Sequence, residues 1–238
     1  MTEVFALLSY GDTGWGDELL AGAWITIQLA VVSLAVGLAL GLVLAAGRLS
    51  PILPVRLGVE GLNGFVRGTP EFLILLLVYF GLEQALQSGV LALGFNVRVE
   101  IPKFLAAVLG LSLIFGVYAC EVFRGAYLAV PRGQMEAAVA CGMSPIQAFV
   151  LVRLPQMWRF AIPGLGNLWM VLLKDTSLAA VIALDDLLRQ AKVASETTRA
   201  PLVFYVAAAV IYLVLTGLSD VARHKLEQRA RRGIGEAR

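Results

Sequence analysis

The sequence predicts an all-α integral membrane protein with about five membrane-spanning helices. Hydrophobic residues make up 59% of its 238 residues, charged residues only 15%, and the mean hydropathy is +0.81. Soluble domains contain roughly 45 to 50% apolar and about 25% charged residues. Because each crossing of the hydrocarbon core needs about 20 apolar residues, a chain of this length has room for four to six spans in one membrane domain.

Two uncharged stretches mark the first and the last span. Leu19 to Gly47 is 29 residues without a charge, so this helix must tilt or emerge from the bilayer. Pro201 to Ser219 is 19 uncharged residues and begins with proline, which the first turn of a helix accepts. Residues 1–18 hold four acidic residues and no Lys or Arg, so they lack the basic region of a cleaved signal peptide.

Three further apolar runs, with charges inside them or at their edges, supply the middle spans: Gly61–Leu86, Phe104–Val130 and Phe160–Leu184. Two Gly-x-x-x-Gly pairs, Gly37 with Gly41 and Gly64 with Gly68, have the spacing that lets helices approach closely in lipid. Glycine is also common in membrane helices without such a contact, so both interpretations stay open.

The distribution of Lys and Arg sets the orientation, because cytoplasmic loops next to spans are enriched in them. Five spans with an outside N-terminus put thirteen of the 19 basic residues on the cytoplasmic side. We therefore predict an external segment over 1–18, a membrane domain over 19–222 and a basic cytoplasmic tail over 223–238. The net charge of +2 gives no electrostatic support for a nucleic-acid partner.

The most informative segment is the cytoplasmic connection between the third and fourth spans, residues 131–159. Residues 136–141 are rich in alanine and should be helical. Gly142 is suited to the left-handed residue that often ends a helix. A first short helix ending at a glycine turn is therefore expected.

A second helix is predicted to follow at once. Ser144 should be its N-cap, with Pro145 at the first helical position and Gln147 placed to complete a capping box. Pro155 is expected to end this helix on its far side. The result is a stiff knob of two helices on the cytoplasmic face, which another protein could bind.

The spacing within this connection is Glu-Ala-Ala, three residues, Gly, nine residues, a β-branched aliphatic residue, one residue and Leu-Pro. It resembles the hallmark of the permeases of binding-protein-dependent ABC importers, with Val152 where that family usually has isoleucine. Other segments resemble the polar amino acid branch of the family, in particular the Q-type subunits for histidine and arginine: Arg67–Pro70, Phe123–Pro131, Leu154–Arg159 and Lys174–Leu178.

The resemblance implies the MetI-like fold of type I ABC importer permeases, with a cytoplasmic coupling helix, in the bacterial inner membrane. It implies three partners besides the lipid bilayer: a second permease subunit, a cytoplasmic ATPase dimer and an extracytoplasmic amino-acid-binding protein. The second permease is either a copy of this chain or a related M-type chain, and the Q-type resemblance favours a heterodimer. The residues implied to couple to the ATPase are Glu136, Ala137, Ala138, Gly142, Ser144, Leu154 and Pro155.

ATP and Mg²⁺ would then be bound by the ATPase and not by this chain. The sequence agrees, since it contains no Gly-x-x-x-x-Gly-Lys-Ser/Thr phosphate loop. It also contains no HExxH, no G-x-S-x-G and no cluster of His and Cys, so no catalytic residue, no metal site and no membrane-embedded enzyme is predicted.

Ionisable residues inside predicted spans are candidates for the substrate path, because they are costly in lipid. Glu121 and Arg124, three apart on one helix face, either line the path or pair and neutralise each other. A second set could line a path for a zwitterion or lie at the contact between permeases: Lys174, Asp175, Thr176 and Ser177. These charges do not distinguish a cationic from an acidic or a neutral amino acid.

The predicted function is therefore that of a permease subunit for polar amino acids, in particular histidine, arginine, lysine or ornithine, driven by a separate ATPase. The main alternative is a gradient-driven secondary transporter or a channel component. The spaced loop motif and the odd number of spans without an inverted repeat argue against it. A scaffold without a transport path of its own is the other alternative.

Overall fold

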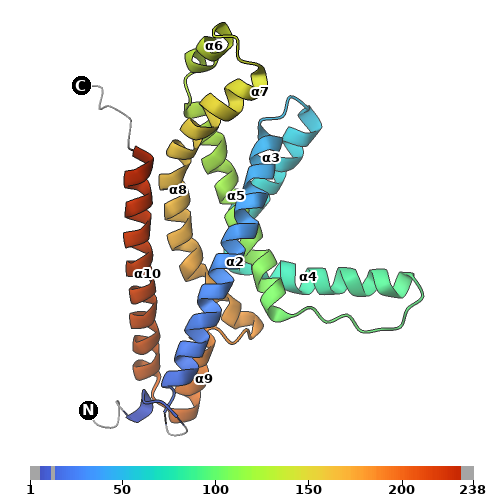
Figure 1. Cartoon of the computed structure of the whole chain (residues 1–238). Coiled ribbons are helices and arrows are strands. Elements are labelled where there is room, and N and C mark those ends of the chain that lie inside the picture. The colour runs from blue at the N-terminus through green and yellow to red at the C-terminus, as the bar shows by residue number, and fades with distance from the viewer. Residues whose placement is uncertain (1–5, 12–13, 232–238) are drawn as a thin grey trace.

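The computed structural model describes residues 6–11 and 14–231, and within these ranges all regular secondary structure is helical (Figure 1). In chain order the elements are α2 (Gly16–Arg48), α3 (Leu53–Gly68), α4 (Glu71–Ala92), α5 (Lys103–Ala129), α6 (Arg132–Ala140), α7 (Pro145–Ala148), the π-helical turn η1 (Phe149–Arg153), α8 (Leu154–Asp175), the 3₁₀ segment η2 (Thr176–Ile182), α9 (Leu187–Thr198) and α10 (Pro201–Arg231).

Within the described residues, five helical segments are long and apolar enough to cross a membrane, which confirms the predicted number of spans: Gly16–Arg48, Glu71–Ala92, Lys103–Ala129, Pro145–Ile182 and Pro201–Ala230. Of the predicted external segment, 1–18, residues 1–5 and 12–13 lie outside the described part of the chain. Its last three residues, 16–18, belong to α2. Within the predicted tail, 223–238, α10 continues to Arg231, and residues 232–238 lie outside the described part.

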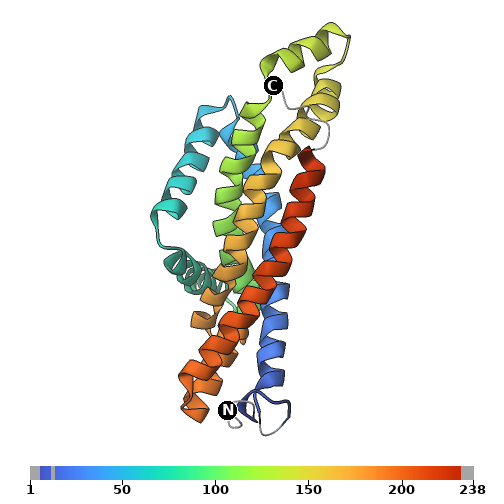
Figure 2. The ribbon, with the colours of Figure 1, turned by 90° about the vertical axis from the view of Figure 1, so that its left-hand side faces the viewer.

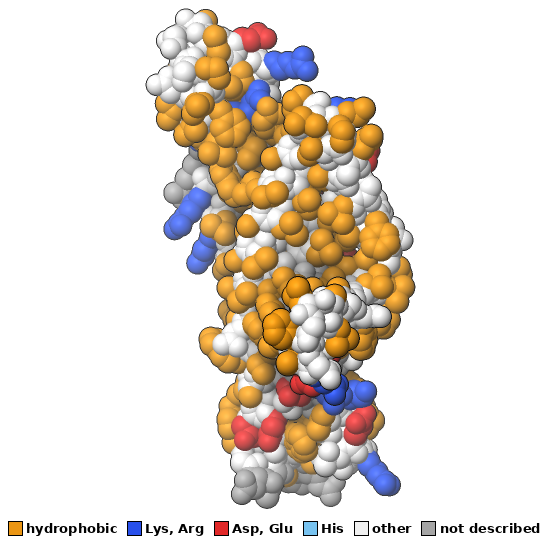
Figure 3. Space-filling view, turned by 90° about the vertical axis from the view of Figure 1, so that its right-hand side faces the viewer, with side chains coloured by type: hydrophobic (Ala, Val, Ile, Leu, Met, Phe, Trp, Pro, Cys, Tyr) orange, Lys and Arg blue, Asp and Glu red, His pale blue; other side chains and the backbone are white. Residues whose placement is uncertain are grey.

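Helix α5 lies at the centre of the bundle. It packs against α2 and α8, and its most apolar stretch is the most buried of the five. Helices α2, α5, α8 and α10 run side by side in both ribbon views, whereas α4 projects away from the bundle (Figures 1 and 2). On the face shown in Figure 3, hydrophobic side chains cover much of the surface, as expected for contact with lipid.

The packing of α2 on α5 depends on glycine. A β-carbon at Gly37 would lie 2.7 Å from the Phe115 ring, and one at Gly41 would lie 2.8 Å from the Ala119 β-carbon. A β-carbon at Gly64 or Gly68 would meet nothing within 4 Å. Of the two predicted Gly-x-x-x-Gly contacts, only the first is a close helix approach in this chain.

Gly41→Leu is expected to destabilise the protein by about 1 to 3 kcal/mol, because a large side chain must push α2 and α5 apart. The measurement is the thermal midpoint of the purified transporter complex, followed by size-exclusion chromatography after heating. Gly64→Leu makes the same chemical change where the structure is open and should leave the midpoint unchanged. Equal losses for both variants would contradict the packing argument.

The second predicted span, Gly61–Leu86, is divided in the structure. Thr69 has extended backbone angles (φ −106°, ψ 140°) and precedes Pro70, so α3 ends there and α4 begins at Glu71. A residue before proline is disfavoured in the helical region, which the hydropathy of the run does not reveal. The apolar span is α4, and α3 is an additional helix with only Asn63 and Val66 buried.

The fourth predicted span, Phe160–Leu184, is part of a longer helical segment that begins at Pro145 and ends at Ile182. The prediction that Pro155 ends the preceding helix is wrong, because Pro155 lies in the first turn of α8 and the chain stays helical. The wide π turn η1 comes directly before α8. Its wider backbone relieves the clash that a proline ring within a helix makes with the carbonyl group of the preceding turn. The Gln156 side chain donates to the Val152 carbonyl at 3.0 Å, which pairs one backbone group of this turn.

The opposite end of the bundle is closed by α9, which packs between α2 and α10. Asp186 is the N-cap of α9, and its Oδ1 accepts the Arg189 N–H at 2.9 Å. Its Oδ2 is buried and has no hydrogen-bond partner among the described residues. Burial is the main reason why the pKa of Asp186 is raised to about 6.

A raised carboxyl pKa means that the folded state binds the Asp186 proton more tightly than the unfolded state. The contribution of Asp186 to the free energy of unfolding is therefore largest below the pKa that this carboxyl group has in the unfolded chain. It falls by up to roughly 3 kcal/mol as the pH rises towards about 6. Asp186→Asn keeps an N-cap and removes the charge, so it should raise the thermal midpoint above pH 6 and flatten the pH dependence between pH 4 and 6. A variant midpoint that follows the wild type at every pH would contradict this assignment.

Candidate functional site

Two short helices form a knob beyond the ends of α5 and α8 (Figure 1). Gly142 follows α6 with φ +83°, as predicted for a left-handed residue. The Met143 N–H bonds to the Ala138 carbonyl at 3.1 Å and the Gly142 N–H to the Val139 carbonyl at 2.9 Å. This pair of hydrogen bonds is a Schellman motif, which satisfies carbonyl groups at the end of α6.

The second helix of the knob begins with the predicted capping box. Ser144 Oγ accepts the Gln147 N–H at 3.3 Å, and Gln147 Oε1 accepts the Ser144 N–H at 2.9 Å. Ala138 and Ala148 are buried, whereas Glu136 and Ala137 on the same knob are exposed. The small residues let α6 and α7 pack closely, and they leave Glu136 available to a partner.

The knob and the π turn after it also carry exposed apolar side chains: Val139, Ile146 and Leu151 are 57%, 76% and 63% exposed. Exposed apolar groups that gather on one protruding element are typical of a protein-binding surface. Leu154 is half-buried and joins the hydrophobic core, and Pro155 is exposed. The Arg153 guanidinium lies 4.3 Å from the centre of the Tyr127 ring, so the base of the knob is attached to α5.

Gly142→Ala is expected to destabilise the knob by about 1 to 2 kcal/mol, because a β-carbon is disfavoured at a positive φ. Hydrogen exchange of peptides from residues 132–153 measures this directly as faster exchange. The matched control is Gly133→Ala, which lies within α6 in open space and should slow exchange, since alanine favours helix over glycine. A change of the exchange rate in the same direction for both variants would contradict the assignment of Gly142 to a left-handed turn.

A second group of polar residues lies inside the membrane domain. Asp175 is the last residue of α8, where the helix changes to the 3₁₀ segment η2, and Glu71 is the first residue of α4. Tyr118 of α5 lies beside these two carboxyl groups. All three line one cavity of about 10 Å³, which has room for about one water molecule.

The other predicted path residues do not converge on this cavity. Lys174 and Ser177 line a separate pocket of about 300 Å³ on the side of α10, together with Tyr205. Thr176 is buried, and its Oγ1 donates to the Leu173 carbonyl at 2.7 Å, a local side-chain-to-backbone hydrogen bond that Thr often makes in helices. Of residues 174–177, Asp175 alone lines the cavity that contains Glu71.

Glu71 was not among the predicted site residues, although it lies within the predicted second span. The rule that singled out Asp175, an ionisable group inside a span, applied to Glu71 as well. Arg67, at the end of α3, was also not among the predicted site residues, and its guanidinium lies 5.9 Å from the centre of the Tyr118 ring, midway along α5. The break between α3 and α4 brings both residues to the site.

Glu121 and Arg124 form the ion pair that the sequence suggested, with 3.0 Å between Glu121 Oε2 and Arg124 Nη2. Glu121 also lies 3.7 Å from Arg48 Nε and accepts from Asn63 Nδ2 at 3.3 Å. Arg48 in turn pairs with Glu60 at 2.8 Å. These charges balance and tie α2, α3 and α5 together, so the Glu121 pair is structural in this conformation.

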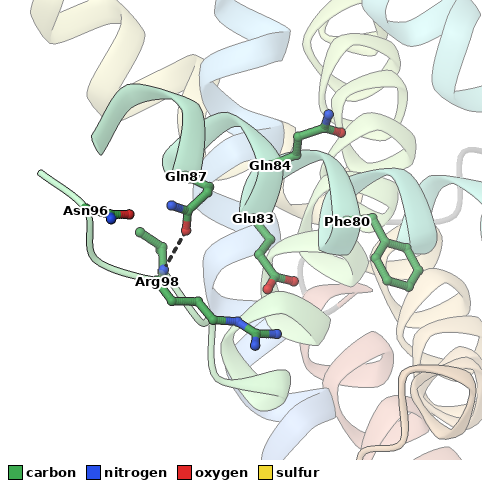
Figure 4. A pocket seen from close by; sticks show the side chains of 7 residues that line it. Phe80, Glu83, Gln84, Gln87, Asn96 and Arg98 are labelled. Carbon is green, nitrogen blue, oxygen red and sulfur yellow. Dashed lines mark hydrogen bonds between the residues drawn. The ribbon is translucent and has the colours of Figure 1, made fainter. Parts of the chain in front are cut away.

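A further polar pocket of about 490 Å³ lies where α4 meets the loop that leads to α5 (Figure 4). Gln87 fixes this loop, since its Oε1 accepts the Val99 N–H at 2.8 Å and its Nε2 donates to the Val97 carbonyl at 3.1 Å. Glu83 and Arg98 also line the pocket. Arg98 pairs with Glu100 at 3.3 Å, and both side chains are largely exposed.

The model of one protein family, the binding-protein-dependent transport system inner membrane component, matches residues 37–232. The chain belongs to this family. The matched region contains the knob and both carboxylates of the intramembrane pocket. The predicted family is thereby confirmed, and the gradient-driven alternative has no support among the relatives found.

Several permeases are similar to this chain over nearly its whole length. The nopaline transport system permease protein NocQ of Agrobacterium fabrum (strain C58 / ATCC 33970) is 43% identical over 231 residues, covering 96% of this chain and 97% of the relative. The histidine/lysine/arginine/ornithine transport system permease protein HisQ of Escherichia coli (strain K12) is 37% identical over 224 residues, covering 94% and 98%. The arginine ABC transporter permease protein ArtQ of the same strain is 41% identical over 228 residues, covering 90% and 95%.

Among solved structures, a crystal structure of an amino acid ABC transporter with histidines matches with a TM-score of 0.77 and 31% identity, covering 90% of this chain and 95% of that one. An inward-facing structure of the MetNI methionine ABC transporter matches with a TM-score of 0.66 and 19% identity, covering 90% and 96%. The second match concerns the fold alone. Together they confirm the MetI-like fold of this inner membrane transport permease.

Proposed function

We propose that this permease subunit carries basic amino acids, such as histidine, arginine, lysine or ornithine, and that Glu71 and Asp175 bind their cationic side chains. The observation that carries the proposal is the pair of carboxyl groups facing one cavity inside the membrane domain. Carboxylates pair with ammonium and guanidinium groups through charge-assisted hydrogen bonds, which are strongest away from water. An acidic substrate would be repelled at the same place.

The names of the similar permeases support the same substrate class, since HisQ and ArtQ are named for histidine, lysine, arginine and ornithine transport. The cavity itself is too small for an amino acid in this conformation. Both carboxylates lie at joints of the backbone, one at the break between α3 and α4 and the other at the change from α8 to η2. Such joints are suited to absorb the movement that opens the site.

Lys174, Thr176 and Ser177 belong to the proposed path in a secondary role. Lys174 and Ser177 line the separate pocket on the side of α10, where polar groups would meet the backbone end of a zwitterion during passage. Glu121 and Arg124 would contribute only if their network with Arg48 opens in another conformation.

The knob would couple this path to ATP hydrolysis. In this proposal a separate ATPase dimer binds ATP and Mg²⁺ and holds α6 and α7 in a groove, with Glu136 as the charged anchor and Val139 and Ile146 as apolar contacts. Closure of the ATPase dimer would move the knob and, through α5 and α8, tilt the spans. The knob and the C-terminus are then cytoplasmic, and the N-terminus is outside.

A second permease subunit, a related M-type chain, would cover the projecting helix α4. Only 11% of the apolar window of α4 is buried within this chain. An extracytoplasmic amino-acid-binding protein would deliver substrate at the opposite end from the knob. This arrangement matches the family description, which names binding-protein-dependent transport.

Reconstitution in liposomes tests the proposal. The chain is assembled with its co-encoded partner permease, ATPase and binding protein, and ATP-dependent uptake is followed for labelled arginine, lysine, histidine, glutamine and glutamate. We expect uptake of the basic amino acids and little or none of glutamate. Uptake that prefers glutamate, or is equal for all five, would contradict the role of the carboxyl pair, and uptake that does not need ATP would contradict the coupling.

A further inference from the structure

Glu71 and Asp175 line the same small cavity, so the charge on one carboxyl group affects the protonation of the other. Both carboxyl groups come from membrane-spanning segments, and each would be an acceptor if it were ionised. Two ionised carboxylates that share one small cavity repel each other strongly, and a proton on one of them removes this repulsion and lets the two groups hydrogen-bond. Among the described residues, Tyr118 is the only other polar side chain that lines this cavity.

In the described part of the chain, no Lys, Arg or His nitrogen lies within 4.0 Å of either carboxyl group. Ion pairs within 4.0 Å among residues 6–11 and 14–231 all involve other carboxylates. The charged groups nearest in the chain are Arg67, which lies over the Tyr118 ring, and Lys174, which lines a different pocket. The rest of the cavity wall is apolar: Leu111, Ile114, Phe115, Leu168, Val171 and Leu172.

We propose that the substrate-free pair of Glu71 and Asp175 holds one shared proton, and that a cationic amino acid side chain displaces this proton to the solvent when it binds. The inference rests on the proposed substrate site. The exchange keeps the net charge of the pocket constant, because one positive charge enters as one proton leaves. A neutral amino acid offers no charge to replace the proton, so the exchange also favours basic substrates.

Calorimetry of substrate binding tests this exchange. The complete complex of this chain, its partner permease and the ATPase is placed in lipid nanodiscs without nucleotide or binding protein. Arginine is titrated at the same pH into phosphate and into Tris, whose different ionisation heats report the protons released. We expect release approaching about one proton per arginine at low pH, with affinity rising by up to about tenfold per pH unit until the pair is ionised.

Three comparisons make the outcome specific. Asp175→Asn and Glu71→Gln each remove the shared proton, so arginine should bind more weakly and release almost none. Glu83→Gln changes a carboxylate of the same helix outside the cavity and should release as many protons as the wild type. Glutamine titrated into the wild type should release none.

The two proposals fail in different ways. Arginine binding by the wild type without proton release at any pH would overturn the exchange and leave the substrate site standing. Proton release that persists in both cavity variants would also overturn it, because the proton would come from elsewhere. If the wild-type complex does not bind arginine, or binds it unchanged in both cavity variants, the proposed substrate site falls and the exchange falls with it.

Discussion

Asp175→Asn is expected to lower the apparent affinity for arginine about 10- to 100-fold in the reconstituted transporter. A hydrogen bond to a charged group contributes roughly 1.5 to 3 kcal/mol, and this variant removes the charge while keeping the shape of the side chain. The measurement is the concentration of binding-protein-bound arginine that gives half-maximal ATP-dependent uptake. The half-maximal concentration for glutamine, where glutamine is transported, should change much less.

Asp185→Asn is the matched control, since Asp185 is an exposed carboxylate ten positions further along the chain and does not line the cavity. This control should transport arginine as the wild type does. Assembly of each variant is checked by co-purification of the ATPase. An unchanged half-maximal concentration in Asp175→Asn, with normal assembly, would remove Asp175 from the substrate site.

Glu136→Lys is expected to reduce ATP-dependent uptake by roughly 30-fold or more, whichever basic amino acid is used. Reversing a charge at a protein contact costs at least as much as losing one partner of a buried charge pair, which is about 2 to 5 kcal/mol. Co-purification of the ATPase with the permease should fall in parallel. The half-maximal concentration of substrate should not change, because the knob and Asp175 lie at opposite ends of α8, a helix of 22 residues.

Gln134→Lys separates a specific contact from a general charge effect. Gln134 is exposed on the same helix, two residues before Glu136, and also becomes positive. Uptake close to wild type in Gln134→Lys beside a large loss in Glu136→Lys would support Glu136 as an anchor. A similar loss in both variants would point to repulsion of any positive charge, and no loss in either would exclude this helix from coupling.

The knob could be predicted almost completely from the sequence. Its turn depends on Gly142, and its second helix on Ser144 and Gln147, which are three residues apart. Capping and helix termination act between neighbours along the chain, so their sequence signals are sufficient. Pro155 is the exception, because its effect depends on whether the preceding turn can widen to a π turn, and the sequence does not reveal that.

The number of spans could be predicted for a similar reason. Transfer of about 20 apolar residues into lipid depends on composition within a window, and the windows are visible in the sequence. The break at Thr69 was missed, because the apolar run continues on both sides of it and a single proline can either kink or end a helix.

The intramembrane site was decided only by the tertiary structure. The sequence by itself determined that the chain is an all-helical membrane protein with a protruding knob, and that Asp175 is an unusual carboxylate within a span. It could not determine that Glu71, about a hundred residues earlier in the chain, would share a cavity with Asp175, or that Lys174 would line a different pocket. Contacts between helices depend on how each one is rotated and where each one breaks, and close packing of small groups such as Gly41 against α5 fixes both.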